Sequence, residues 1–176
     1  QMIDKLPEER KAQYAQLRAI AGIPLAYFAW YTSDVNGSIV YSEAFKARYA
    51  TPALFTPKYD TQETLFNILD KELKDIVVAL KVEQPVAQIN LGNNDIYFKG
   101  DVTKWIKAAN SLRLRIAFRL MKQNPEKMKA IATEVLVNDA DVINAIDEDW
   151  KLVGGTAHFA DGHNNTSSTG DMYSAK

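Results

Sequence analysis

The chain has 176 residues, a formal net charge of −1 and no cysteine. This length predicts one domain with a sizeable core, and 47% hydrophobic with 24% charged residues is ordinary for a soluble globular protein. The near-neutral charge and the lack of a basic run argue against a nucleic-acid partner. The absence of cysteine excludes disulfides, thiol catalysis and cysteine-based zinc sites within these residues.

The first predicted helix spans residues 7–33. Pro7 and the two glutamates after it are typical of a helix N-terminus. Pro24 should kink or split this helix, and Asp34-Val-Asn-Gly37 predicts its end in a turn. The apolar rhythm predicts a buried stripe of Tyr14, Leu17, Ala21, Leu25 and Phe28.

Residues 38–58 contain prolines and aromatics without periodicity, which predicts a long structured loop. Asp60 and Glu63 then have the spacing of a capping box, in which Asp60 caps the next helix and Glu63 reaches back. The buried stripe of that helix is predicted to be Leu65, Leu69, Leu73, Ile76 and Leu80. Pro85 ends the segment, and residues 86–99 form a loop that carries Ile96-Tyr97-Phe98 into the core.

The strongest helical pattern lies at residues 100–122, with Asp101 or Thr103 as its N-cap. Two apolar stripes on opposite sides predict a helix packed from both sides. The first is Trp105, Ala109, Leu112, Ile116 and Leu120, and the second is Leu114, Ala117, Phe118 and Met121.

Asn110 and Arg113 fall between these stripes, so we expect both to be at least partly buried and hydrogen-bonded. The favoured interpretation is structural, in which they tie this helix to a neighbouring segment. The alternative is a direct contact with a ligand.

A further helix begins at Asn124, with Pro125 in its first turn, and a short helix is predicted from Asp139 to Ile146. From residue 154 the sequence turns polar, with little that could build a core. We therefore predict an all-α domain of antiparallel helices over residues 1–153, followed by a polar loop or tail at 154–176.

Three motifs resemble one family in the same order along the chain. The stretch Gly100–Leu120, GDVTKWIKAANSLRLRIAFRL, is similar to a signature of SusD/RagB-type proteins. Asp34-Val-Asn-Gly37 followed by Tyr41-Ser-Glu-Ala-Phe45, and Pro57-Lys-Tyr-Asp-Thr-Gln-Glu63, resemble motifs of the "SusD-like 2" branch. Val40 departs from the family pattern, which usually has proline there.

The resemblance implies a tetratricopeptide-like helical scaffold, no cofactor and no catalysis. Such proteins are surface-exposed lipoproteins of the outer membrane that hold oligosaccharide and deliver it to a TonB-dependent, SusC-like transporter. The family begins with a signal peptide and a lipid-modified cysteine and is usually far longer. We therefore expect this chain to be an internal piece of a longer protein.

Aromatic residues gather where the first helix gives way to the loop, and sugar rings stack on aromatic faces. The candidates for ligand contact are Trp30, Tyr31, Tyr41 and Tyr49. Phe28, Phe66 and Trp105 lie on apolar stripes and are predicted to be core residues.

Other chemistry finds little support in the sequence. Asp139 with Asp141 and the acidic run 147–149 are typical of solvated surfaces rather than of a hydrolase carboxylate pair. His158 and His163 lack zinc-site spacing, and no residues match a calcium loop. The alternatives to nutrient binding are a helical-repeat scaffold for protein or peptide and, less favoured, a glycan-acting hydrolase.

Overall fold

The computed structural model describes residues 3–138 and 141–152. The main helices are α1 (Glu8–Ala12), α2 (Ala15–Asn36), α3 (Lys46–Tyr49), α4 (Gln62–Lys81), α5 (Val102–Arg119) and α6 (Pro125–Leu136). Short 3-10 turns are η1 (Ile3–Lys5), η2 (Gly92–Asn94) and η4 (Ile146–Glu148). Over these ranges the only extended pairing is one antiparallel bridge between Ile39 and Asp60. The all-α prediction is confirmed.

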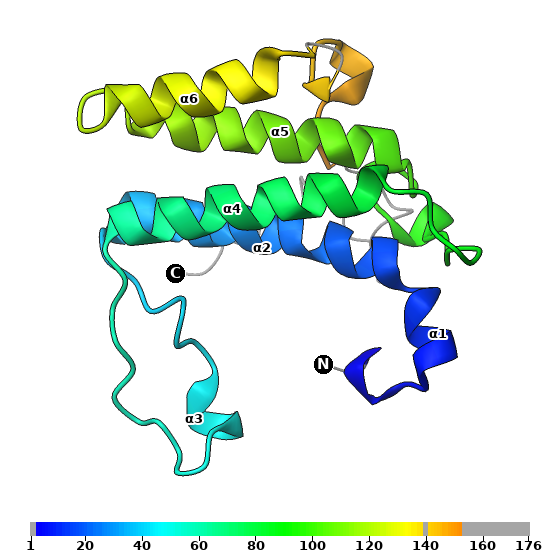
Figure 1. Ribbon diagram of the computed structural model, residues 1–176, viewed down its shortest axis with the longest axis horizontal. Helices are drawn as coiled ribbons and strands as arrows, with labels where there is room; N and C mark the ends of the chain where they lie inside the picture. The colour runs from blue at the N-terminus through cyan, green and yellow to red at the C-terminus, as the bar shows by residue number, and fades with distance from the viewer. Residues whose placement is uncertain (1–2, 139–140, 153–176) are drawn as a thin grey trace, which may run out of the picture.

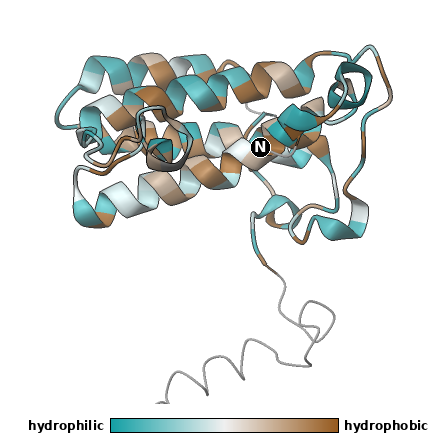
Figure 2. Ribbon diagram, turned by 90° about the horizontal axis from the view of Figure 1, so that it is seen from below, coloured by the Kyte–Doolittle hydropathy of each residue, from teal (hydrophilic) through white to brown (hydrophobic). Residues whose placement is uncertain are grey.

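The long helices stack in order, as Figure 1 shows: α2 packs on α4, α4 on α5, and α5 on α6, with a further contact between α2 and α5. Apolar and polar residues alternate along the helical ribbons (Figure 2). Residues 38–60, which we call the arm, project from the body between the end of α2 and the start of α4 (Figure 1). Within the described residues, no helix is long and apolar enough to cross a membrane.

Helix α5 is the centre of this stack. Asp101 is its N-cap and accepts hydrogen bonds from the backbone N–H groups of Thr103 and Lys104 at 2.9 and 3.1 Å. The first predicted stripe is buried throughout. The second is only partly so, because Phe118 and Met121 are 57% and 52% exposed. The prediction of a helix covered on both sides therefore fails in its last turn.

Asn110 and Arg113 are both buried, as expected. The Asn110 side chain donates to the backbone carbonyl of Asp141 at 3.1 Å. Arg113 donates from Nε to Asp70 of α4 at 2.8 Å and from Nη2 to Glu134 of α6 at 3.1 Å. One buried guanidinium thus joins the middle helix to the helix on either side.

The predicted buried stripe of α2 is wrong. Leu25 and Phe28 are 54% and 61% exposed, so the assignment of Phe28 to the core also fails, whereas Phe66 and Trp105 are core residues. The buried face of α2 is rotated and consists of Ile20, Ile23, Ala26, Ala29, Trp30 and Ser33. Helix α4 approaches where α2 has small side chains: a Cβ added at Gly22 would lie 2.6 Å from the Cδ1 of Ile76.

The break in the first helical segment is also elsewhere than predicted. Pro24 lies within the continuous helix α2, and the chain breaks between α1 and α2 instead. The Gln88 side chain enters the break, donating to the carbonyl of Ala12 at 2.8 Å and accepting from the N–H of Gln16 at 3.1 Å. These two groups would form one helical hydrogen bond, so an inserted side chain replaces it.

The predicted capping box is wrong as well. Thr61 is the N-cap of α4, accepting from the N–H of Thr64 at 3.2 Å, and Glu63 is one position too early to reach back. Asp60 instead faces the arm and accepts hydrogen bonds from the N–H groups of Tyr41 and Ser42, as described below. The predicted stripe of α4 is buried except at Ile76, which is half-buried.

At the C-terminal end, Asn124 caps α6 by accepting from the N–H of Lys127 at 3.1 Å, as predicted. The short helix predicted after Asp139 is not formed over 142–145. Here Ser111 accepts a hydrogen bond from the N–H of Ile143 at 2.9 Å, so contacts with α5 replace helical bonds. Residues 154–176, including both histidines, lie outside the described ranges.

Candidate ligand-binding site

A cavity of about 550 Å³ lies between α2, α5 and the segment that follows α6. We call it the α2–α5 cavity. Its aromatic lining comes from three separate parts of the chain: Tyr27 and Phe28 of α2, Tyr97 of the loop before α5, and Trp150 near the end of the described chain. Ser111 and Arg115 of α5 contribute polar groups.

These aromatic rings contact one another across the elements. Trp150 lies at the centre, with ring centroids 5.3 Å from Tyr27, 5.9 Å from Tyr97 and 5.6 Å from Trp105. Tyr97 meets Trp105 edge-on at 6.0 Å. Edge-on pairs at such distances are favourable and hold the rings in fixed orientations. The aromatic wall is therefore rigid rather than a set of independent side chains.

Asp95 fixes the loop that carries Tyr97. Its carboxylate is buried and accepts hydrogen bonds from the backbone N–H groups of Tyr97, Phe98 and Gly100 at 3.0, 3.2 and 2.9 Å. It also accepts from the indole N–H of Trp105 at 2.7 Å. Burial raises the pKa of Asp95, but these four donors outweigh it and hold the pKa below its usual value. The loop enters the core at Phe98, as predicted, whereas Ile96 stays 39% exposed.

The segment that carries Trp150 is fastened to α5. Besides the contacts of Asn110 and Ser111 described above, Lys107 pairs with Glu148, and this contact with the Lys107 ammonium lowers the pKa of Glu148. Lys104 donates to the backbone carbonyl of Asp147 at 2.7 Å. Four side chains of α5 thus hold the segment that carries Trp150 against that helix.

Arg115 is the cation of the cavity. Its guanidinium lies 5.2 Å from the ring centroid of Trp30, which is within cation–π range. Trp30 is 6% exposed, and its indole N–H has no hydrogen-bond partner among the residues that the structure describes. Trp30 therefore supports Arg115 from beneath and does not line the cavity itself.

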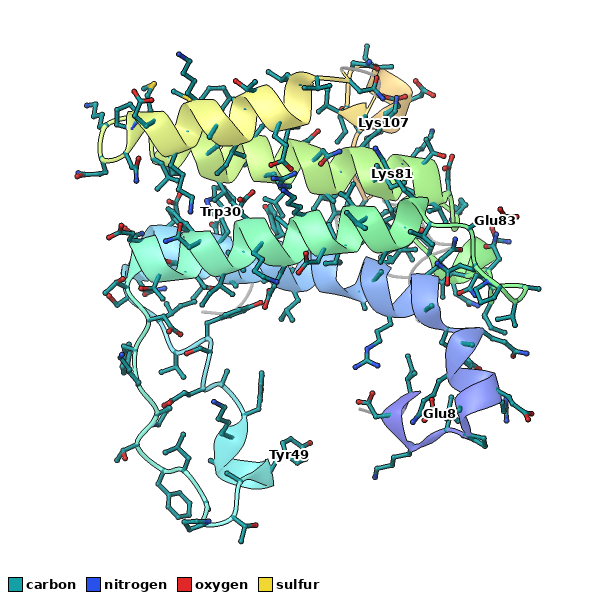
Figure 3. All side chains as sticks on the ribbon, viewed as in Figure 1. Glu8, Trp30, Tyr49, Lys81, Glu83 and Lys107 are labelled. Atoms are coloured by element: carbon teal, nitrogen blue, oxygen red, sulfur yellow. The ribbon has the colours of Figure 1, made fainter. Side chains whose placement is uncertain are left out.

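The structure places the four predicted contact residues in different surroundings. Trp30 is buried between the helices, while Tyr49 lies on the arm, away from the helical body (Figure 3). Tyr31 is 54% exposed and stacks on Tyr27 at 6.3 Å. Tyr41 lies at the base of the arm and donates to Glu72 at 2.6 Å. Burial, followed by this carboxylate, raises the pKa of Tyr41.

Trp30 and Tyr31 are thus brought together beside Tyr27, but Tyr41 and Tyr49 are not. The prediction missed Tyr97 and Trp150, which line the cavity directly. Tyr97 had a sequence signal, since it belongs to the apolar group expected to enter the core. Trp150 had none, because its segment has no periodicity and its position depends on contacts with α5.

The cavity offers stacking surfaces together with hydrogen-bonding groups, among them the hydroxyl of Ser111, the guanidinium of Arg115 and the carboxylate of Asp149. This combination is typical of sites for small organic ligands. Among the described residues, no group of three or more His, Asp or Glu side chains could hold a metal ion.

Comparison with solved structures gives relatives of the same fold. A SusD homologue from Bacteroides uniformis is 31% identical, with a TM-score of 0.64. The match covers 78% of this chain and 27% of the homologue. A chitin-binding SusD homologue from Flavobacterium johnsoniae is 27% identical, with a TM-score of 0.70, covering 81% and 29%. A SusD homologue from Parabacteroides distasonis is 26% identical, with a TM-score of 0.70, covering 91% and 30%.

The chain therefore spans less than a third of the length of these solved relatives. No curated protein matches it. The likeness to the SusD homologues confirms the tetratricopeptide-like helical scaffold that the motifs implied. The model of the SusD-like 2 family, described as "Starch-binding associating with outer membrane", matches residues 1–170. By this match the chain belongs to the SusD-like 2 family.

Proposed function

We propose that this protein captures oligosaccharide at the outer-membrane surface, without breaking a bond, and delivers it to a TonB-dependent, SusC-like transporter. The observation that carries the proposal is the aromatic wall of the α2–α5 cavity in a chain of a starch-binding family. The family's association with the outer membrane supports the location. We further propose that the whole protein is a surface lipoprotein, with its anchor outside the residues described.

In this proposal the ligand binds by stacking and hydrogen bonding. A sugar ring presents flat patches of C–H groups, which would pack on Trp150 and on the exposed face of Phe28. Its hydroxyls would receive hydrogen bonds from Arg115, whose guanidinium is held against Trp30. The rigid contacts among the rings lower the entropic cost of ordering the site when a ligand binds.

A helical scaffold that binds protein or peptide is the second candidate. The arm favours it, because Phe45, Tyr49 and Phe55 are 80%, 77% and 82% exposed. Large apolar side chains grouped on one exposed segment are typical of interaction surfaces.

Tryptophan fluorescence tests the two candidates. Titration with maltotriose or with chitin oligomers should give a saturable change, since Trp150 lies in the cavity. The change should disappear in Phe28→Ala combined with Arg115→Ala, which keeps every tryptophan, and it should persist in Phe55→Ala on the arm. The absence of a saturable change with either sugar, together with Phe55-dependent binding of a peptide mixture, would favour the peptide scaffold. Release of reducing ends from the same sugars would contradict the non-catalytic proposal.

A further inference from the structure

A second cavity lies at the opposite end of α5, where that helix meets the first turns of α4 and α6, and its volume is about 380 Å³. We call it the amide pocket, because four side-chain amides line it: Gln62, Asn67, Gln123 and Asn124. Its volume falls within the range of roughly 300–1,000 Å³ that is usual for small-molecule sites. It shares no lining residue with the α2–α5 cavity.

The floor of the amide pocket is apolar. Phe66 of α4 and Leu120 at the end of α5 both line it and are only 5% and 7% exposed. Their positions are fixed because both belong to the hydrophobic core. The pocket thus has a rigid apolar base and a polar wall.

The polar wall keeps both donors and acceptors available. Gln62 donates to the carbonyl of Ser33 at 2.7 Å, which leaves its oxygen as an acceptor. Asn67 accepts from Lys127 and Asn124 accepts from the N–H of Lys127, which leaves both amide NH₂ groups as donors. In the described part of the chain, the side chain of Gln123 makes no hydrogen bond, so it can supply either.

The charges of the pocket balance. Arg119 is paired with Asp34 of α2 across the helix ends. The remaining two charges, on Glu63 and Lys127, have opposite sign. A charged ligand would gain no net attraction here, whereas a neutral ligand with hydroxyl groups would match the mixed donors and acceptors.

We propose that the amide pocket is a second binding site, which takes one ring of a neutral pyranose sugar. The ring contacts the apolar floor only through the small exposed parts of Phe66 and Leu120, and its hydroxyls bond to the amides of Asn67 and Gln123. The site is separate from the α2–α5 cavity, and it stands or falls independently of the function proposed for that cavity.

The test is NMR titration of the ¹⁵N-labelled 176-residue chain with methyl β-D-glucopyranoside, and with glucuronate as the charged comparison. The side-chain NH₂ signals of Asn67 and Gln123 should shift in a saturable way with the neutral sugar and less with glucuronate. In the double variant Asn67→Ala with Gln123→Ala, the dissociation constant for the neutral sugar should rise by about tenfold or more, since two hydrogen bonds are lost. The side-chain NH₂ signal of Asn124 reports the binding in this variant. Asn93→Ala is the matched control, because this exposed amide lies in η2, at the far end of α5.

Two outcomes would overturn the proposal. One is the absence of saturable shifts at these amides, and the other is binding of equal strength in the double variant with its circular dichroism unchanged. A fluorescence change at Trp150 together with silent amides would overturn this proposal alone. Shifting amides without any response at Trp150 would support the amide pocket and count against the α2–α5 cavity.

Discussion

Two loops of the molecule are each organised around one buried aspartate, but they differ in what the aspartate holds. Asp95 accepts hydrogen bonds from three backbone N–H groups of its own loop and also from the indole N–H of Trp105 on α5. Asp60 accepts the N–H groups of Tyr41 and Ser42 at 3.1 and 2.7 Å and the hydroxyl of Ser42 at 2.8 Å. Only Asp95 therefore connects its loop to a core helix through its side chain.

The consequence appears in the aromatic residues of the two loops. Phe98 is buried beside Trp105, with ring centroids 4.9 Å apart. On the arm, Phe45, Tyr49 and Phe55 remain exposed. A carboxylate that accepts several N–H groups thus shapes a loop in either case, but a contact with a core side chain decides whether the loop becomes part of the core.

The largest effect should come from breaking the core to which the Asp95 loop is attached. Arg113→Ala leaves Asp70 and Glu134 without their shared guanidinium, and Asp70 is largely buried. We expect a loss of about 3–4 kcal/mol in the free energy of unfolding. Chemical denaturation followed by circular dichroism measures this loss, and Arg18→Ala, which removes an exposed pair with Asp4, is the control. A loss in Arg113→Ala no greater than in the control would contradict the role of Arg113 in joining α5 to α4 and α6.

Replacement of the two aspartates tests the comparison directly. Asp95→Ala leaves the Trp105 indole and three backbone N–H groups without their acceptor, so we expect a loss of about 2–3 kcal/mol. Asp60→Ala should cost about 1–2 kcal/mol, because the N–H groups it releases are nearer to solvent. The free energies of unfolding of the two variants provide the measurement. Equal losses would show that the contact with the core adds nothing.

The two carboxylates also predict a dependence of stability on acid. Hydrogen bonds from the Ser42 N–H, and then from the Ser42 hydroxyl and the Tyr41 N–H, hold the pKa of Asp60 below its usual value, as those at Asp95 do there. Both pKa values are lower in the folded state than in the unfolded state. Their contribution is therefore present above the ordinary aspartate pKa, near 3.8, and is lost as the pH falls through the folded values.

We expect the unfolding free energy to fall below pH 4 less steeply in Asp95→Asn than in the unmodified chain, because asparagine does not titrate. Denaturation at a series of pH values between 5 and 2 provides the measurement. Parallel acid profiles for the two chains would show that Asp95 is not a source of the acid dependence.

The smallest effect should come from the exposed aromatics of the arm. Phe55→Ser should change the unfolding free energy by less than about 0.5 kcal/mol, since the side chain is 82% exposed. Phe98→Ala, in the other loop, should cost about 3 kcal/mol, because it leaves a cavity against Trp105. Thermal unfolding of both variants tests the contrast. A fall in the melting temperature of Phe55→Ser as large as that of Phe98→Ala would mean that the arm packs against the body in solution.

The helix ends and the central helix could be predicted from sequence, because their signals are local. Asp101 and Asn124 cap α5 and α6 as expected, since a cap needs only a side-chain oxygen next to the first free N–H groups. The burial of Asn110 and Arg113 followed from their positions between apolar stripes. The motifs around these residues also indicated the family that the comparison established.

The predictions that were wrong concerned features that depend on contacts between distant segments. The face of α2 that is buried was set by where Ile76 of α4 meets Gly22, and not by the largest side chains, so Phe28 is outside the core. The break before α2 came from Gln88, more than seventy residues away in sequence. Asp60 and Thr61 are both residue types that commonly cap helices. Asp60 accepts hydrogen bonds from N–H groups of the arm instead, and Thr61 is the N-cap of α4.

The candidate site also combines features that the sequence predicts with features that only tertiary contacts decide. Sequence alone determined that helices with aromatic residues near their ends would form and which family they belong to, because capping, periodicity and motifs are properties of neighbouring residues. Only the tertiary structure brought Tyr27, Tyr97 and Trp150 around one cavity, since these rings come from three segments with no shared pattern. Their meeting is fixed by hydrogen bonds that Asp95 accepts and by hydrogen bonds with side chains of α5, which become possible only after the helices have packed.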